Sequence, residues 1–246
     1  MKRPTYYSTN NTNERIDFET ALLRGMASDY GLYMIARDEV PVLNIDKIRH
    51  MRTMSYAEIS FEVLYPYLWS EVPEEKLRLL LNDAYREDKI PTYVQHVVGS
   101  TSIMWLTKGP TYSFKDYAAR FFGRMLNYFL KKRGLRRIVV VATSGDTGGA
   151  VADALYGLDS IDNIVFFPKG SISEGQRRQM TTLGGNVFAF EVNGDFDVCQ
   201  ALAKNILGDT QFATETFGDS ERFTSCLLYT SPSPRDRTRS RMPSSA

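Results

Sequence analysis

The sequence predicts an α/β protein in which a doubly wound, mostly parallel sheet is preceded by a small, mainly helical N-terminal domain. First, strand-like and helix-like segments alternate with short loops from residue 137 onward, as they do in parallel sheets with crossover helices. Second, the segment 137–142 is β-branched and apolar on both faces, which is typical of a strand covered on two sides. Third, residues 1–95 show helical rather than strand-like periodicity.

The composition is that of a globular protein. Of the 246 residues, 43% are hydrophobic and 24% are charged. No apolar run approaches the roughly 20 residues that span a bilayer, and polar residues follow Met1 where a secretory signal would be apolar. We therefore expect a cytoplasmic protein with no membrane contact and no signal peptide.

Charge and cysteine content argue against a nucleic-acid-binding protein and against a metalloprotein. The net charge is +1, but four arginines lie in residues 226–246, so the rest of the chain has no basic excess and no nucleic-acid partner is expected. Cys199 and Cys226 have no Cys or His at metal-ligand spacing, and His50 and His96 stand alone. We expect no metal site and a reducing compartment.

Residues 1–95 are predicted to form the helical N-terminal domain. Asp17 is a capping residue for a short helix over 18–26. Ser55 and Glu58 form a capping box that opens a second helix, which Pro66 should kink or end. Leucines and alanines at helical spacing follow in residues 77–85 and indicate a core-facing stripe. This region shows no acid–base pair, so we expect it to cover the next domain or to form a subunit contact.

Residues 96–225 are predicted to form the α/β domain. One or two strands over 95–105, broken at Gly99–Ser100, come first. A helix follows from Lys115, with a basic run at 131–133 in its last turn and Gly134 just past its end, and it is apolar enough to be packed on two sides. The alternating elements that follow are expected in this order: strand 137–142, a helix after Thr147 to Leu155, strand 164–167, a helix capped by Ser173 and running to Met180, strand 186–192 and helix 196–207.

A candidate reactive lysine lies where a loop becomes a helix. Gly109-Pro110 breaks regular structure, and the helical pattern begins near Lys115. The positive end of a helix attracts anions and disfavours a protonated amine, which suits a lysine that reacts as a neutral nucleophile. A solvated surface lysine remains the more common explanation for this motif alone.

A second motif, Thr143-Ser144-Gly145-Asp146-Thr147-Gly148, links a strand to a helix. Its backbone N–H groups can face an anion, and its glycines allow a ligand to approach the backbone closely. No Gly-Lys-Ser/Thr closes the loop, so it is not a nucleotide-binding P-loop. An ordinary strand-to-helix turn is the alternative.

Together the two motifs resemble those of the threonine synthases, which are pyridoxal-phosphate (PLP) enzymes of the tryptophan synthase β fold type. The resemblance extends over about residues 6–210 and includes Pro168–Ser173, Thr182–Asn186 and Gly194–Leu202. It implies that Lys115 forms the imine with PLP and moves protons between substrate carbons. Further implied assignments are cofactor binding by Lys115, Ser144, Gly145, Asp146, Thr147 and Gly148, and substrate binding by Thr143, Ser144, Lys169 and Arg177.

The implied reaction converts O-phospho-L-homoserine and water into L-threonine and phosphate. Two alternatives stay open: another lyase of the same fold type, such as a serine/threonine dehydratase, and a non-catalytic protein that binds a phosphate ester. In this family the loop for the cofactor phosphate follows later in the chain, as does the partner of the pyridine nitrogen. We therefore expect a truncated catalytic domain that binds PLP weakly and turns over no substrate.

Residues 226–246 differ from the rest of the chain. Periodicity ends at Cys226, and Ser, Pro and Arg dominate. The segment Cys226–Asp236 resembles a translated sequencing adapter, so we expect residues 226–246 to be a disordered, non-native tail that is not part of the fold. A basic nucleic-acid arm is the alternative. Nothing in the sequence indicates the oligomeric state.

Overall fold

The computed structural model describes residues 3–25, 27–29, 31–92 and 94–225. Its elements are β1 (Tyr6–Ser8), α1 (Phe18–Arg24), β2 (Tyr33–Ile35), α2 (Ile45–His50), α3 (Tyr56–Leu68), α4 (Glu74–Ala84), β3 (Val94–Val98), β4 (Thr101–Met104), α5 (Lys115–Arg133), β5 (Arg137–Ala142), α6 (Asp146–Leu155), β6 (Ile161–Pro168), α7 (Glu174–Thr181), β7 (Val187–Val192), α8 (Phe196–Gly208), α9 (Thr210–Phe217) and β8 (Phe223–Ser225), with 3₁₀ turns at Arg37–Glu39 and Met51–Thr53. The expected adapter-like tail and Met26, the expected end of the first helix, lie outside the described residues.

Strands β5 to β8 form one parallel sheet in the order β7-β6-β5-β8, which confirms the predicted parallel α/β fold. Strand β6 is longer than the predicted range 164–167. Its backbone already pairs with β5 at Ile161, opposite Arg137, so polar residues at its start belong to the strand. The sequence pattern did not predict helix α9 or the short strand β8. Strand β8 pairs with β5 and forms that edge of the sheet.

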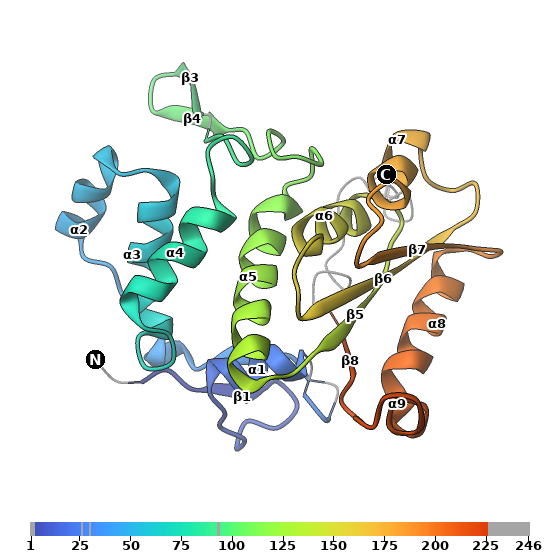
Figure 1. Ribbon diagram of the computed structural model, residues 1–246. Helices are drawn as coiled ribbons and strands as arrows, with labels where there is room; N and C mark the ends of the chain where they lie inside the picture. Colours follow the sequence, from blue (N-terminus) through green and yellow to red (C-terminus); the bar gives the residue numbers. More distant parts are fainter. Residues whose placement is uncertain (1–2, 26, 30, 93, 226–246) are drawn as a thin grey trace, which may run out of the picture.

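Helices cover the sheet on both faces, so it is doubly wound as predicted. Alternate residues of each strand point to opposite faces. Val139 and Val141 of β5 pack with α5, α6 and Met180 of α7, whereas Ile138 and Val140 pack with α8. Figure 1 shows α5 and α6 on one side of the strands and α8 on the other.

Helix α5 belongs to two cores, which confirms that it is packed on two sides. Leu126 and Leu130 face the sheet core, and Met125 and Phe129 face the helical N-terminal region. Leu77 and Leu81 of α4 lie in this second core, as their spacing predicted. In Figure 1, α5 stands between the α3–α4 pair and the sheet.

The C-terminal end of α5 has both of the signals that the sequence offered. Gly134 takes a left-handed conformation (φ 65°) and closes the helix after the predicted basic run. Lys132 and Arg133 of that run reach across to Glu19 of α1, at 3.1 and 2.6 Å. Cations near a helix C-terminus are favourable, and these two ion pairs also hold α1 against the end of α5.

The capping signals of the N-terminal region are confirmed. Asp17 accepts a hydrogen bond from the Thr20 N–H, and Ser55 and Glu58 form the full capping box. Pro66 lies inside α3, which ends two residues later at Leu68. No helix in the described part of the chain combines the length and apolar character needed to cross a membrane.

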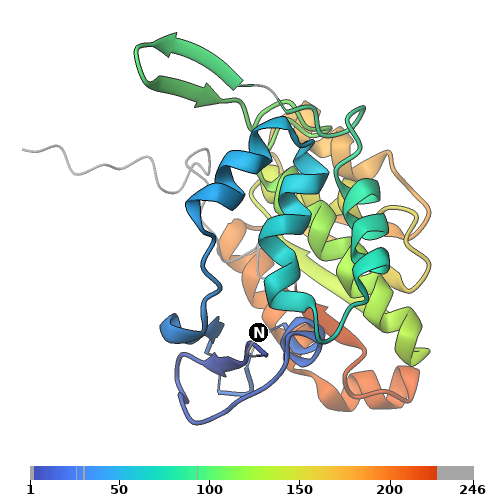
Figure 2. The ribbon, with the colours of Figure 1, turned by 90° about the vertical axis from the view of Figure 1, so that its left-hand side faces the viewer.

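Of the one or two strands expected around Gly99–Ser100, two are present, as the antiparallel hairpin of β3 and β4. It does not join the parallel sheet and extends away from the rest of the fold (Figures 1 and 2). Its apolar side chains stay exposed, from 44% for Met104 to 75% for Val98. The loop after this hairpin leads to the predicted lysine motif.

Replacing Asn163 with valine is expected to stabilise the fold. This residue is the third of β6, is fully buried and pairs with Val139 of β5 and Val187 of β7. Neither its Oδ1 nor its Nδ2 has a hydrogen-bond partner among the described residues. Removing buried unpaired polar atoms should raise the free energy of unfolding by about 1–3 kcal/mol in urea denaturation.

Asn186→Val is the matched control. The Asn186 amide donates to the carbonyl oxygens of Leu155 and Ile161 and accepts from Gly157 N–H, so its loss should destabilise the fold. Equal destabilisation by both substitutions would contradict the interpretation of Asn163.

Candidate active site

The two predicted motifs meet at one edge of the sheet. Helix α5 leads directly into β5 and runs opposite to it, so Lys115 at the start of α5 lies at the carboxyl end of β5. The loop 143–145 leaves β5 at that same end and begins α6, which packs against α5. In open parallel sheets this edge is where ligands bind.

Lys115 is the first residue of α5 and is only 1% exposed. Its backbone N–H donates to Ser113 Oγ at 3.3 Å, and the Asp116 N–H donates to the Ser113 carbonyl oxygen at 3.1 Å. Its Nζ lies 4.4 Å from the centre of the Phe114 ring. The amine is therefore held below the surface at the positive end of a helix, rather than solvated.

Asp116 holds the loop that precedes Lys115. Its carboxylate accepts from Thr111 N–H at 3.0 Å and from Thr111 Oγ1 at 2.5 Å. A Cβ added at Gly109 would lie 2.4 Å from Asp116 Oδ2, so only glycine fits there. The carboxylate is 1% exposed, and burial raises its pKa above the ordinary value of 3.8, although the Thr111 hydrogen bonds act in the opposite direction.

A pH dependence follows from this buried carboxyl. Because its folded pKa is raised, the native state binds the Asp116 proton more tightly than the unfolded state, and its contribution to stability falls as pH rises above 3.8. We expect the unfolding free energy of wild type, relative to Asp116→Asn, to decrease between about pH 3 and 7 in urea titrations.

Asp88→Asn is a control of opposite sign. The pKa of exposed Asp88 is lowered by its hydrogen bond from Arg86, so its advantage over asparagine should grow as pH rises toward 3.8 and stay constant at higher pH. An advantage of Asp116 that also grows with pH would contradict the assignment.

Thr143 organises the Gly-rich loop. Its Oγ1 accepts from the N–H groups of Gly145 at 3.0 Å and Gly148 at 2.9 Å. Gly145 has φ 141°, a conformation that side chains rarely adopt. These bonds take the place of a side-chain N-cap, so α6 begins at Asp146, ahead of the predicted start after Thr147. The hydroxyl oxygen of Thr143 thus points into its own loop.

The loop offers both donors and a fixed carboxylate. With Gly145 and Gly148 engaged by Thr143, the backbone N–H groups of Ser144 and Thr147 have no protein acceptor within the described chain. Asp146 is 8% exposed, and its Oδ1 accepts from Gln176 Nε2 of α7 at 2.9 Å. A buried amine beside such donors suits a ligand that has an aldehyde and anionic groups.

The predicted phosphate-binding residues lie on the connection from β6 to α7. Lys169 is exposed just after β6. Arg177 is engaged by Glu174 of its own helix, with bonds of 2.7 and 2.9 Å. Hydrogen bonds from Arg177 and Arg178 lower the pKa of Glu174 to about 2. The structure therefore places Lys115, Thr143 and the loop 144–148 at the same edge of the sheet. Among the described residues, the hydrogen bonds and ion pairs of Arg177 go to its own helix rather than to this loop.

Three residues of the site were not predicted: Thr111, Gln176 and Gln179. Gln179 Nε2 donates to the Thr111 carbonyl oxygen at 3.3 Å, so α7 touches the lysine loop as well as the Gly-rich loop. Only Gln176 had a local signal, because Ser-x-x-Gln is a capping box and Ser173 is its partner.

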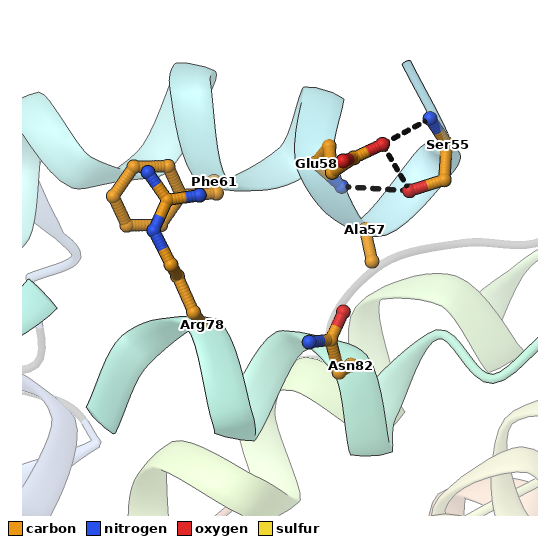
Figure 3. A pocket seen from close by; sticks show the side chains of 6 residues that line it. All are labelled: Ser55, Ala57, Glu58, Phe61, Arg78 and Asn82. Carbon is orange, nitrogen blue, oxygen red and sulfur yellow. Dashed lines mark hydrogen bonds between the residues drawn. The ribbon is translucent and has the colours of Figure 1, made fainter. Parts of the chain in front are cut away.

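A separate cavity of about 330 Å³ lies between α3 and α4. Figure 3 shows its lining residues: Ser55, Ala57, Glu58, Phe61, Arg78 and Asn82. Glu58 is used by the helix cap, and the Arg78 guanidinium stacks 3.5 Å from the centre of the Phe61 ring. These groups already serve the packing of α3 on α4, and the residues of the candidate active site are not among them.

Comparison with known families gives two adjacent matches. Residues 5–85 match the family described as threonine synthase N terminus, and residues 105–224 match the family of pyridoxal-phosphate dependent enzymes. Both candidate motifs, around Lys115 and Ser144, fall in the second match.

Known relatives agree with these matches. The chain is 34% identical to threonine synthase of Pseudomonas aeruginosa, covering 86% of this chain and 45% of that protein. It is 36% identical to threonine synthase of Schizosaccharomyces pombe, covering 85% and 42%. The chain thus spans a little under half the length of these relatives.

Solved structures show the same fold. The crystal structure of PLP-bound threonine synthase from Brucella melitensis superposes with a TM-score of 0.81 and 35% identity, covering 91% of this chain and 47% of that one. Threonine synthase from yeast gives a TM-score of 0.78 and 32% identity, covering 90% and 45%.

Proposed function

Because this chain belongs to the threonine synthase family of PLP-dependent enzymes, we propose that it provides the lysine and the Gly-rich loop of a threonine synthase active site. The whole enzyme would convert O-phospho-L-homoserine and water into L-threonine and phosphate. The observation that carries the proposal is the buried amine of Lys115 at the edge of the sheet where the loop 144–148 begins α6.

The residues present fit the cofactor. A buried primary amine at a helix N-terminus suits an aldehyde, and the loop supplies N–H donors for the oxygens of a bound ligand. When bound, PLP supplies an electron sink for the carbon chemistry. Lys115 binds the cofactor and, once displaced by substrate, carries a proton on Nζ between substrate carbons.

The loop residues orient the substrate in this proposal. Ser144 and Thr147 direct backbone N–H groups toward the substrate carboxylate, and Thr143 keeps the loop in shape. Lys169 and Arg177 remain the proposed partners of the substrate phosphate. Arg177 would then exchange Glu174 for that phosphate, since both present the paired oxygens that its guanidinium binds.

We further propose that the two parts of the chain have different roles. Residues 1–95 form the helical part that covers α5, and residues 96–225 carry the site. The match of residues 5–85 to the threonine synthase N terminus favours this enzyme over a serine/threonine dehydratase or a non-catalytic phosphate-ester binder.

The test is covalent trapping with the chain as it stands. The purified protein is mixed with PLP, reduced with borohydride and digested, and the modified lysines are mapped by mass spectrometry. We expect the label that saturates at the lowest PLP concentration to lie on Lys115. Label distributed over exposed lysines such as Lys108, with Lys115 unmodified at all concentrations, would contradict the proposal.

A further inference from the structure

Helix α7 contacts both loops of the candidate active site through one face. Gln176, Gln179 and Met180 lie on that face, since residues three and four apart are neighbours on a helix. Gln176 donates to Asp146 in the Gly-rich loop, and Gln179 donates to Thr111 in the lysine loop. Through α7, the two amides thus connect the loop at Thr111 with the loop at Asp146.

The fit between α7 and these loops is tight. A Cβ added at Gly145 would lie 2.5 Å from Gln176 Nε2, and one at Gly148 would lie 2.7 Å from Met180 Sδ. A Cβ at Gly149 would lie 2.9 Å from Gln179 Oε1. The glycines of α6 therefore let α7 approach the start of α6 closely, and the two amides fill that contact.

Each amide also belongs to a chain of hydrogen bonds. Gln176 Oε1 accepts from Ser173 N–H and Ser173 Oγ at 3.0 Å each, so one side chain caps α7 and holds Asp146. Thr111, whose carbonyl oxygen is held by Gln179, is bound through its N–H and hydroxyl to Asp116, the neighbour of Lys115. A displacement of α7 would move both loops.

We propose that α7 sets the spacing between Lys115 and the loop 144–148, with Gln176 and Gln179 as positioning residues. This meaning for catalysis rests on the proposed function, whereas the coupling of the loops does not. Gln176 holds the Gly-rich loop, and Gln179 holds the lysine loop. Neither side chain reacts: each fixes a backbone segment that presents the groups around the reacting amine.

Gln176→Glu separates the hydrogen bond to Asp146 from the capping of α7 at Ser173. Glutamate keeps oxygens that accept from Ser173, because Glu and Gln both serve in a capping box. It loses the N–H group that donates a hydrogen bond to Asp146 and places a second carboxylate beside the Asp146 carboxylate. In hydrogen exchange of the chain without cofactor, we expect the amides of 143–149 to exchange about tenfold faster or more, and those of α7 to keep their protection.

Gln179→Ala should act on the other loop. Amides of 109–114, including the Tyr112 N–H that donates to Gly109, should exchange faster while those of 143–149 stay unchanged. Gln211→Ala is the matched control, because Gln211 makes a comparable 2.8 Å hydrogen bond to Glu215 on α9, and its loss should affect neither loop.

A reciprocal exchange tests the geometry. In Gln176→Glu/Asp146→Asn, the asparagine amide can donate to the glutamate, so donor and acceptor change places and protection of 143–149 should return. Exchange that is unchanged in Gln176→Glu, or faster over all of α7 and not rescued in the double variant, would overturn the proposal.

Borohydride trapping connects the inference to the lysine. Wild type should label at Lys115, and Gln176→Glu and Gln179→Ala should each label several-fold more slowly at the same PLP concentration, with recovery in the double variant. Unlabelled wild type would refute the proposed function, while the exchange pattern still decides whether α7 couples the loops. Normal labelling in both single variants would refute their positioning role.

Discussion

Replacing Lys115 with methionine is expected to abolish the borohydride-stable label at this position and to leave the chain folded. Methionine keeps an unbranched stem of similar length in a site that is 1% exposed, but it has no amine to react with an aldehyde. Burying an ammonium group costs free energy even where partners surround it. We therefore expect the urea midpoint of Lys115→Met to equal or exceed that of wild type.

The matched control is Lys108→Met, seven residues earlier in the same segment. Lys108 is exposed, with its Nζ 5.5 Å from the centre of the Trp105 ring, and its loss should not change the label on Lys115. If Lys115 were a structural residue, its replacement would lower the midpoint markedly while labelling continued at other lysines. That combination would contradict its role as the reactive amine.

The parts of the fold that sequence reasoning found are those with local signals. The capping box at Ser55 and the capping residue Ser173 are signals within one turn, and α3 and α7 begin directly after them, as predicted. Strand β6 was predicted too short because Asp162 and Asn163 are polar, although pairing with β5 makes them part of the strand. Nothing in the sequence shows that Asn163 is buried without a partner, because that depends on the two neighbouring strands.

The same distinction applies to the site. Lys115 and the loop 144–148 could be located because each motif contains glycine or proline residues that interrupt regular structure shortly before a helix begins. Gln176 was visible only as a cap, since its bond to Asp146 spans 30 residues. The role of Thr143 was missed for another reason: its hydroxyl faces backward into the loop, which residue type alone does not reveal.

Replacing Thr143 with valine should produce the largest loss of stability at the site. Valine has nearly the same shape as threonine but has no oxygen, so the N–H groups of Gly145 and Gly148, both in buried residues, would lose their acceptor. Each unpaired buried donor costs about 1–3 kcal/mol, and for two donors we expect the free energy of unfolding to fall by about 2–6 kcal/mol in urea denaturation. Labelling of Lys115 should slow as well, because the loop loses its shape.

Thr143→Ser distinguishes the hydroxyl from the methyl group. Serine keeps the acceptor and removes Cγ2, which is the atom that a Cβ at Gly148 would approach to 2.4 Å. Thr143→Ser should therefore cost little by itself and should reduce the penalty of Gly148→Ala in the double variant. The contacts that remain there are the flexible Met180 side chain at 2.7 Å and the Cβ of residue 143 at 3.0 Å. Strictly additive penalties would show that the methyl group does not limit this position. Equal destabilisation by Thr143→Ser and Thr143→Val would show that the hydroxyl does not hold the loop.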